Sequence, residues 1–484
     1  MQPKNLLVLM ADEHQAAITG CYGNPCVETP NLDALAARGT RFTNAYTNSP
    51  ICVPARAIFA TGRYAHQTSH WDNAFPYYGE PESWGHRLQA AGISVESIGK
   101  LHYRRQEDSS GFDVEHDAMY VAEGIGEIVS CLRGRAPHRQ GRGGIVKAGP
   151  GDSSYLNYDR RITTQARDWL HAHAADETPW VLFVSFVCPH PPFIAPPELF
   201  AHYAQMDLPF PHQWQQPEWP THPALNFFRT HFGWEAPVDE ASIQRMLATY
   251  YALCTFVDQN VGKVLNTLSD LGLAEATRVL YTSDHGAMLG ARGLFGKFTM
   301  YEEAARIPMI VAGPDVPANK TVDTPVSLVD GYPTILSALD VNDDANTPPR
   351  PGQSLWQLAQ GPTQERTIFS EYHAAGTRNA IFMLCDGAYK YIHYVHEAPQ
   401  LFDLANDPGE LVNQAENPAY TAVRADFEER LRDLLDPEAI DAQAKAEQLA
   451  KVADFGGEAA VLARGLSNSP IPGEAPVFQR NLSN

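Results

Sequence analysis

The stretch NSPICVPARAIFATGRYAHQTSH, residues 48–70, gathers residue types that are able to do chemistry. Cys52 stands two residues before Pro54 and four before Arg56. Pro54 suits the first turn of a helix, where backbone N–H groups have no partner inside the helix. Those N–H groups and the guanidinium of Arg56 both attract an oxyanion. Cys52 is therefore expected where an anionic group binds, as a packed thiol, a nucleophile or the precursor of another group.

Polar side chains follow four apolar segments, at the point where each predicted strand ends. In open α/β sheets, ligands bind beyond the carboxyl ends of the strands, so polar residues there gather on one rim. A single polar strand end is weak evidence, but four together predict a site. The residues concerned are Asp12, Glu13, Lys100, His102, His190, Asp284 and His285.

Three of these residues suggest a metal site. The carboxylates of Asp12 and Asp284 suit a hard divalent cation, and the imidazole of His285 is compatible with Ca²⁺, Mn²⁺ or Mg²⁺. The alternatives are a capping or turn acid at Asp12 and a salt-bridged turn at Asp284 and His285. We favour the metal because the two acids lie far apart in the sequence, yet both follow apolar strands.

Short apolar runs alternate with helical patterns over most of the chain. This alternation predicts an α/β fold in which a mostly parallel or mixed sheet has helices on both faces. Beyond about residue 365 the pattern changes to short antiparallel strands and one helix at 420–434, which predicts a smaller C-terminal α+β subdomain. The last thirty or so residues are interpreted as an arm around a neighbouring subunit or a loose tail. The expected strands of the main sheet are 5–12, 92–99, 180–187, 278–284 and 307–313.

Two regions do not follow this alternation. Residues 104–155 are rich in Gly and Arg, and residues 189–240 are rich in Pro and aromatic residues. Loops of this length are usually binding loops or lids. A mobile surface insertion is an equal alternative for 104–155, whereas the Trp and Phe residues of 189–240 favour burial.

Composition narrows the class of protein. The chain has 484 residues, 44% of them hydrophobic, and a formal net charge of −21, so we expect a globular protein that binds neither nucleic acid nor an anionic membrane. No apolar run reaches the length of a membrane-spanning helix, and no signal peptide is visible. The seven cysteines are scattered and predict neither a zinc site nor a disulfide framework. A reduced, cytoplasmic protein is the simplest expectation.

Several motifs occur in the order known from one family. Together they cover most of residues 5–415, and the chain resembles the type I sulfatases of the alkaline phosphatase superfamily. The core of the resemblance is C-x-P-x-R at Cys52, Pro54 and Arg56. The other matching segments are TPNLDALAARGTRFTNAYT, TGRYAHQ, GKLH, PHPPF, SDHG, GKFTMYEEAARIPMIV and LFDLANDPGEL.

The resemblance implies an alkaline phosphatase-like α/β/α sandwich with a large mixed sheet as the catalytic domain, residues 1–365. Residues 366–484 would form the C-terminal subdomain, with an antiparallel sheet and an oligomerisation tail. It also implies that Cys52 is oxidised to formylglycine by a maturation enzyme. One hydroxyl of the hydrated aldehyde would attack sulfur, and the other would drive the release of sulfate.

Roles for individual residues follow from the same resemblance. Asp12, Asp284, His285 and Cys52 would hold one divalent metal, with Ca²⁺ expected and Mn²⁺ or Mg²⁺ as alternatives. Arg56 would stabilise the aldehyde hydrate, and His102 would be the base that opens the hemiacetal. The substrate would be bound by Asn73, Lys100, His190 and Lys297, and the last two would contact the ester oxygen.

Two positions depart from the commonest pattern. Glu13 stands where a second Asp is usual, which leaves its role as a ligand open, and His285 stands where Asn is frequent. Both features resemble the phosphonate monoester hydrolase and choline-sulfatase branches, whereas Lys100-x-His102 is sulfatase-like. We expect hydrolysis of aryl or other small sulfate esters, with the 189–240 segment forming the leaving-group pocket.

Phosphonate monoester or phosphodiester hydrolysis is the first alternative to this activity. A choline-sulfatase-type enzyme and a non-catalytic anion-binding relative are further alternatives. We also expect a homodimer or homotetramer.

Overall fold

The structure is a computed structural model that describes residues 4–139, 141 and 143–479. Its main feature is a mixed sheet of eight strands in the order β11-β2-β10-β9-β1-β7-β4-β5. The strands are β1 (Asn5–Asp12), β2 (Gly39–Phe42), β4 (Ser94–Lys100), β5 (Val114–Met119), β7 (Trp180–Pro189), β9 (Thr277–Ser283), β10 (Met309–Ala312) and β11 (Lys320–Val322).

The direction of the strands decides where polar residues meet. β1 runs parallel to β7 and β9, and β4 runs parallel to β7, so four of the predicted strands end at the same edge of the sheet. β10, the fifth predicted strand, is antiparallel to both β9 and β2. The residues that follow β1, β4, β7 and β9 are therefore brought to one rim, as expected for ligand binding in an α/β sheet.

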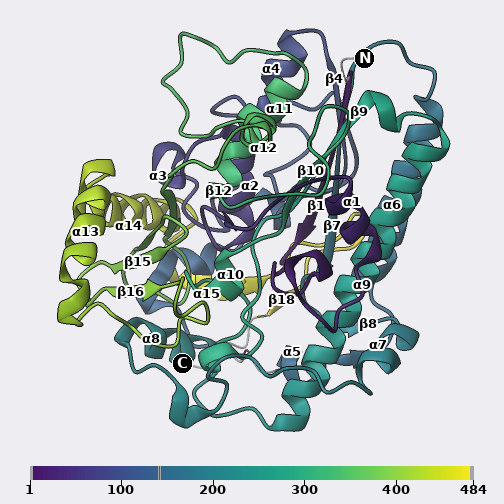
Figure 1. Cartoon of the computed structure of the whole chain (residues 1–484). Coiled ribbons are helices and arrows are strands. Elements are labelled where there is room, and N and C mark those ends of the chain that lie inside the picture. The colour runs from purple at the N-terminus through teal and green to yellow at the C-terminus, as the bar shows by residue number, and fades with distance from the viewer. Residues whose placement is uncertain (1–3, 140, 142, 480–484) are drawn as a thin grey trace.

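Helices cover both faces of this sheet (Figure 1). Leu7 and Leu9 of β1 belong to one hydrophobic core with α6 (Ser154–Ala172) and α9 (Glu240–Asp270). Leu6 and Val8 belong to the opposite core with α2 (Cys52–Thr61), α4 (Trp84–Ala90) and α11 (Gly331–Ala338). Successive residues of a strand point to opposite faces, so a strand buried on both faces is apolar throughout. The predicted α/β/α sandwich is confirmed.

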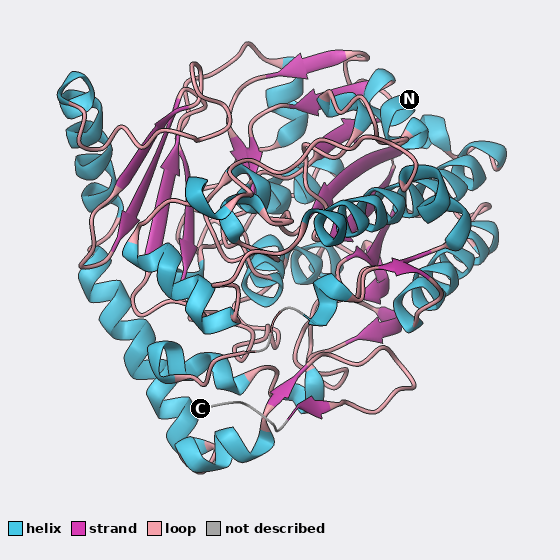
Figure 2. Cartoon of the chain, turned by 90° about the horizontal axis from the view of Figure 1, so that it is seen from below, coloured by secondary structure: helices cyan, strands magenta, loops and turns pink. Residues whose placement is uncertain are grey.

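A second sheet stands apart from the first (Figure 2). Its four antiparallel strands are β13 (Ile368–Tyr372), β14 (Ile381–Cys385), β15 (Tyr389–Tyr394) and β16 (Gln400–Asp403). The predicted helix is α13 (Thr421–Leu434), and two further helices follow that the sequence did not predict, α14 (Pro437–Asp454) and α15 (Glu458–Arg464). Asp436 caps α14 by accepting a hydrogen bond from the N–H of Ala439.

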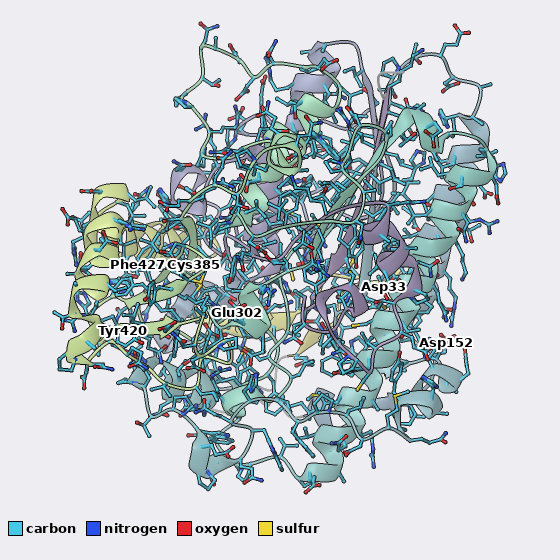
Figure 3. The ribbon with its side chains drawn as sticks, viewed as in Figure 1. Asp33, Asp152, Glu302, Cys385, Tyr420 and Phe427 are labelled. Atoms are coloured by element: carbon cyan, nitrogen blue, oxygen red, sulfur yellow. The ribbon has the colours of Figure 1, made fainter. Side chains whose placement is uncertain are left out.

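A buried ion cluster connects the small sheet to the main body. Lys390 of β15 lies 2.6 Å from Glu302 and 2.7 Å from Glu410, and its side chain is fully buried. Glu302 begins α10 (Glu302–Ala305) and is labelled between the two sheets in Figure 3. Because a buried charge must be paired, this cluster fixes the position of the small sheet.

The C-terminal segment returns to the main body. β17 (Leu466–Ser467) pairs with β18 (Phe478–Gln479), and Arg464 Nη1 donates to the carbonyl oxygen of Gly126 over 2.7 Å. Residues 480–484 of the predicted oligomerisation tail lie outside the described residues. The division at residue 365, the oligomeric state and the cytoplasmic location stay predictions. Within the described part of the chain, no helix is both long and apolar enough to cross a membrane.

The remaining elements connect these layers. The helices are α1 (Pro30–Ala37), α3 (Ala65–Thr68), α5 (Gly143–Val146), α7 (Pro197–Tyr203), α8 (Pro223–Phe232), α12 (Leu355–Gln360) and the 3-10 segment η3 (Ile128–Arg135). The short strands are β3 (Ala45–Tyr46), β6 (Gly149–Pro150), β8 (Ile194–Ala195) and β12 (Val326–Ser327).

Candidate active site

The residues singled out in the sequence converge on one cavity at the carboxyl edge of the large sheet. The cavity has a volume of about 200 Å³. Six predicted site residues line it directly: Cys52, Asn73, Lys100, His102, His190 and Lys297. The three predicted metal ligands Asp12, Asp284 and His285 are fully buried beside Cys52.

Helix α2 presents Cys52 to this cavity. Cys52 is the first residue of the helix and is 1% exposed, and all ten residues of α2 are buried. The side chain of Ile51, which precedes the helix, does not cap it. Instead, Asn73 Oδ1 accepts a hydrogen bond of 3.2 Å from the N–H of Val53. Gly62, with φ +64°, ends the helix in the left-handed conformation that glycine permits. The free end of a buried helix therefore points toward the site, as the sequence predicts.

Three ligand atoms gather around Cys52 Sγ, which is the fourth of the group. This sulfur lies 3.2 Å from His285 Nε2 and 3.7 Å from Asp12 Oδ1. His285 Nε2 lies 3.7 Å from Asp284 Oδ1, and the other ring nitrogen contacts the carbonyl oxygen of Gly286 at 3.0 Å. That backbone contact turns Nε2 toward the group, as is common for metal-binding imidazoles. Two carboxylates, one imidazole and one cysteine converging in this way fit a divalent cation.

Arg56 holds the carboxylates in place. Its Nε donates to Asp284 Oδ2 over 2.9 Å, and its Nη2 lies 3.2 Å from Asp12 Oδ2. Nη1 donates to the carbonyl oxygen of Lys100, and Lys100 Nζ lies 2.6 Å from Asp12 Oδ2. Burial alone would raise the pKa of Asp12. The positive groups around it outweigh burial and bring the pKa well below its usual range; they are Lys100, His190, Lys297 and Arg56. The ends of β1, β4 and β9 are thus joined by one buried guanidinium.

Glu13 faces the opposite side of the cluster. Its Oε2 accepts a hydrogen bond of 3.0 Å from Lys297 Nζ and lies 3.7 Å from His190 Nε2. Its Oε1 is buried and has no hydrogen-bond partner in the described structure. Whether Glu13 is a metal ligand stays a prediction. In the structure Glu13 groups with Asp12 and His190, separately from Asp284 and His285.

Burial lowers the pKa of both cavity histidines, which favours the neutral imidazole. Burial, reinforced by the positive charges of Lys100 and Arg56, lowers the pKa of His102 well below its usual value. Both ring nitrogens of His102 lack a hydrogen-bond partner among the described residues, although the residue is 7% exposed. Burial and Lys297 likewise lower the pKa of His190. A neutral imidazole with free nitrogens is able to accept a proton.

The thiol of Cys52 is a poor nucleophile in this setting. Burial raises its pKa to about 12, and the nearby Asp12 adds to the shift. Lys297 Nζ lies 3.0 Å from Sγ, but its charge does not offset the burial. A thiol attacks as its thiolate, so a cysteine in this position is expected to be inert as sulfur.

The cavity wall differs from the prediction. Apart from His190, the described residues of the 189–240 segment do not line it; Phe232 instead stacks behind the cavity residue Phe298, with ring centroids 4.7 Å apart. The wall comes from the 104–155 segment, which the sequence left open between a binding loop and a mobile insertion, and from the C-terminal segment. The residues that the sequence did not identify are Val53, Val121, Gly126, Glu127, Arg139, Tyr155, Phe298, Ser467, Asn468 and Ser469.

Few of these residues lie in a sequence motif that could have identified them. Phe298 follows Lys297 directly in the GKF motif, so it could have been included. Most of the other wall residues belong to loops without apolar periodicity, and their place depends on tertiary contacts, such as that of Glu127 N–H with the carbonyl oxygen of Asn73.

Comparison with known proteins agrees with this geometry. The profile described as Sulfatase matches residues 4–341, more than half of the chain. The chain belongs to the sulfatase family. A second profile, described as N-sulphoglucosamine sulphohydrolase, C-terminal, matches residues 290–436 of this sulfatase. Family membership makes it a sulfuric ester hydrolase.

The sulfatase has curated relatives along nearly its whole length. It is 30% identical to a choline-sulfatase of Rhizobium meliloti (strain 1021) over 427 residues, 86% of this chain and 83% of the relative. It is 29% identical to arylsulfatase K of Bos taurus, over 89% of this chain and 81% of the relative.

Solved structures share the fold. The phosphonate monoester hydrolase of Agrobacterium radiobacter superposes with a TM-score of 0.72 at 22% identity, over 99% of this chain and 100% of that one. A protein solved in complex with D-glucosamine-2-N,6-O-disulfate superposes with a TM-score of 0.72 at 23% identity, over 92% and 99% of the two chains.

Proposed function

We propose that this sulfatase hydrolyses aryl or other small sulfate monoesters through a formylglycine made from Cys52, with one divalent metal, and releases inorganic sulfate and an alcohol or phenol. One observation carries the proposal: Cys52 stands at a buried helix end, among cations, with a thiol whose pKa is raised to about 12. Such a cysteine is badly placed to act as a thiolate. It is well placed to be replaced by an aldehyde, whose oxygen would stand near the present position of Sγ.

The buried position of Cys52 bears on how it is modified. Every residue of α2 is buried, so an enzyme that recognises Cys52, Pro54 and Arg56 has no access to them in the folded chain. We therefore expect the maturation enzyme to act before this part of the chain has folded.

The charges around the cavity support an anionic substrate. The buried cations Arg56, Lys100 and Lys297 face the carboxylates of Asp12, Glu13 and Asp284, so the side chains balance one another. A divalent cation held by Asp12, Asp284, His285 and the oxygen that replaces Sγ would add positive charge and supply Lewis-acid chemistry. Ca²⁺ suits the carboxylates, and Mn²⁺ or Mg²⁺ is the alternative.

The chain's own residues have separate tasks in this proposal. Lys100 and Lys297 bind the sulfate oxygens, and they are preorganised because both are nearly buried and already paired. His190 lies beside the ester oxygen that gains charge as the leaving group departs. His102, whose ring has no hydrogen-bond partner among the described residues, accepts the proton of the remaining hydroxyl as sulfate is released and the aldehyde is restored. The volume of about 200 Å³ and the rings of Tyr155 and Phe298 fit a small or aromatic leaving group.

The test compares esters that differ only in the transferred group. With 4-nitrophenyl sulfate and 4-nitrophenyl phenylphosphonate, we expect kcat/KM to be higher for the sulfate. Cys52→Ala should abolish activity while metal analysis still finds the ion bound, and mass spectrometry of the wild-type peptide should show formylglycine at position 52. An unmodified thiol in active protein would refute the mechanism.

Phosphonate monoester or phosphodiester hydrolysis is the second candidate. The observation in its favour is His285, which supplies Nε2 to the ligand group where many sulfatases have Asn. A pocket for one tetrahedral oxyanion does not easily exclude another. A clear preference for the phosphonate in the paired assay would support this candidate, and choline sulfate in the same assay tests the third.

A further inference from the structure

A second cavity, outside the active site, is lined by cations. It has a volume of about 350 Å³ and lies between η3, α14 and the loop that joins β13 to β14. Arg133 and Arg135 come from η3, Arg378 from the loop and Lys445 from α14. Four cations around one cavity are unexpected in a chain whose net charge is −21.

These four cations are only partly neutralised. In the described structure two carboxylates pair with them: Asp441 contacts both Arg133 and Lys445, and Glu458 contacts Arg135. The pairs leave an excess of two positive charges at the cavity. The buried Asp72 lies behind the cavity and bonds to Gln448, and burial raises the pKa of its carboxyl.

Arg133 is a buried member of this group of cations. It is 5% exposed, and its Nε donates to Gln448 Oε1 over 2.7 Å. Its Nη2 is buried without a hydrogen-bond partner among the described residues. Buried polar groups are almost always satisfied, so this nitrogen without an acceptor leaves the charge of Arg133 incompletely paired at the cavity wall.

Arg378 is held in position, and no carboxylate of the described residues pairs with it. Its guanidinium lies over the ring of Phe227, 4.0 Å from the centroid, a contact that fixes the side chain and leaves its charge available. A Cβ at Gly134 would lie 3.1 Å from Arg378 Cγ, so glycine at this position lets the arginine stem lie close to η3. Packing against Phe227 and against Gly134 therefore fixes the side chain of Arg378 at the cavity.

We propose that this cavity binds a small tetrahedral dianion, either free phosphate or sulfate or the phosphate group of a small monoester. The oxyanion accepts hydrogen bonds from the side chains of Arg135, Arg378 and Lys445, and its two negative charges match the two positive charges in excess. Leu132 and Leu449 line the same cavity and provide an apolar surface for the body of a monoester. The site is separate from the catalytic cavity and does not depend on the function proposed above.

Calorimetric titration of the full-length chain with phenyl phosphate tests the proposal, because the catalytic cavity and the second cavity are counted separately. We expect the R135Q/R378Q variant to bind one equivalent fewer than the wild type, whatever the catalytic cavity binds, and its catalytic activity should be unchanged. At the second cavity, removal of two cations should weaken binding at least about tenfold. The control is R160Q, which also removes an exposed arginine from a surface ion pair, with Asp152, but lies away from the cavity.

The same titration with inorganic phosphate identifies the source of the dianion. Tighter binding of phenyl phosphate assigns the site to a monoester, and equal binding assigns it to the free ion. An unchanged stoichiometry in R135Q/R378Q, or an equal loss in R160Q, would overturn the proposal.

Discussion

Lysines taken one at a time are usually solvated surface charges. In this chain Lys100 is 1% exposed and Lys297 is 7% exposed, and each is paired with a carboxylate of the β1 end. Truncating one partner of such a pair leaves a buried charge, which is strongly destabilising. Loss of activity in lysine variants would therefore mix catalysis with folding, so His102 is the more informative residue.

His102 offers a clean test at the residue scale, because its ring makes no hydrogen bond in the described structure. In His102→Ala we expect kcat to fall by about 10²–10⁴-fold, the usual contribution of a general base. The first turnover should persist, since the proposed role lies in sulfate release. Stopped-flow measurement with 4-nitrophenyl sulfate should then show a burst of phenol close to one equivalent of enzyme.

Added imidazole serves as the control for His102. The small base should enter the space left by the ring and restore part of the steady-state rate without changing the burst. A variant that loses the burst together with the steady-state rate, and that imidazole does not rescue, would contradict the assignment and indicate a structural role.

The end of β7 shows how elements position the site. Asp159 of α6 is fully buried, and its two carboxylate oxygens accept hydrogen bonds from the N–H groups of Val187 and Cys188, over 2.8 and 2.9 Å. His190 follows two residues later. One helix thus fixes the backbone from which a cavity histidine projects.

Asp159→Asn tests this connection. The amide offers one acceptor where two N–H groups need one each, so we expect a loss of about 1–3 kcal/mol in the free energy of unfolding, as for an unsatisfied buried donor. Activity should fall with it, because His190 loses its support. Denaturant unfolding and kcat/KM on one preparation measure both effects, and Asp168→Asn, an exposed acid on the same helix, is the control.

The pH dependence of the same variant has a defined sign. Burial raises the pKa of Asp159 from 3.8 to about 7, so its stabilising contribution is complete below pH 3.8 and is lost as the pH rises through about 7. Between pH 5 and 7, the stability of the wild type relative to Asp159→Asn should fall by up to about 1.4 kcal/mol per pH unit. Parallel stability curves would disprove this assignment of the proton.

The strands that carry the site were predictable, because strands buried on both faces are continuous apolar runs such as NLLVLM and WVLFVSFV. Helix α14 was not. Its buried face is spaced like a helix but includes polar residues, Asp441 and Gln448, which bond to Lys445 and Arg133. A search for apolar stripes misses such a face. The cavity wall was also missed, because Ser467 and its neighbours reach it only through the tertiary fold.

At the scale of the whole molecule, a C-terminal segment and an N-terminal helix meet at the active site. The C-terminal segment reaches the wall of the cavity and is anchored at Gly126, which accepts hydrogen bonds from Arg464 and from Ser467 Oγ. A Cβ at Gly126 would lie 2.0 Å from the carbonyl oxygen of Asn73, so only glycine permits this close approach. The wall, the cap of α2 and residues 464–469 therefore form one connected unit.

This arrangement predicts that the C-terminal segment selects the leaving group. Asn468 and Ser469 offer hydrogen-bonding groups on the wall, and each bond lost to the substrate should cost about 0.5–1.5 kcal/mol. In N468A/S469A we expect KM to rise about 5- to 140-fold for esters whose leaving group carries hydroxyls, such as glucose 6-sulfate, with little change for methyl sulfate. Glu474→Ala, an exposed position in the same segment, should leave both substrates unaffected. If the KM for each ester is the same in N468A/S469A as in the wild type, the segment closes the cavity without contributing to substrate selection.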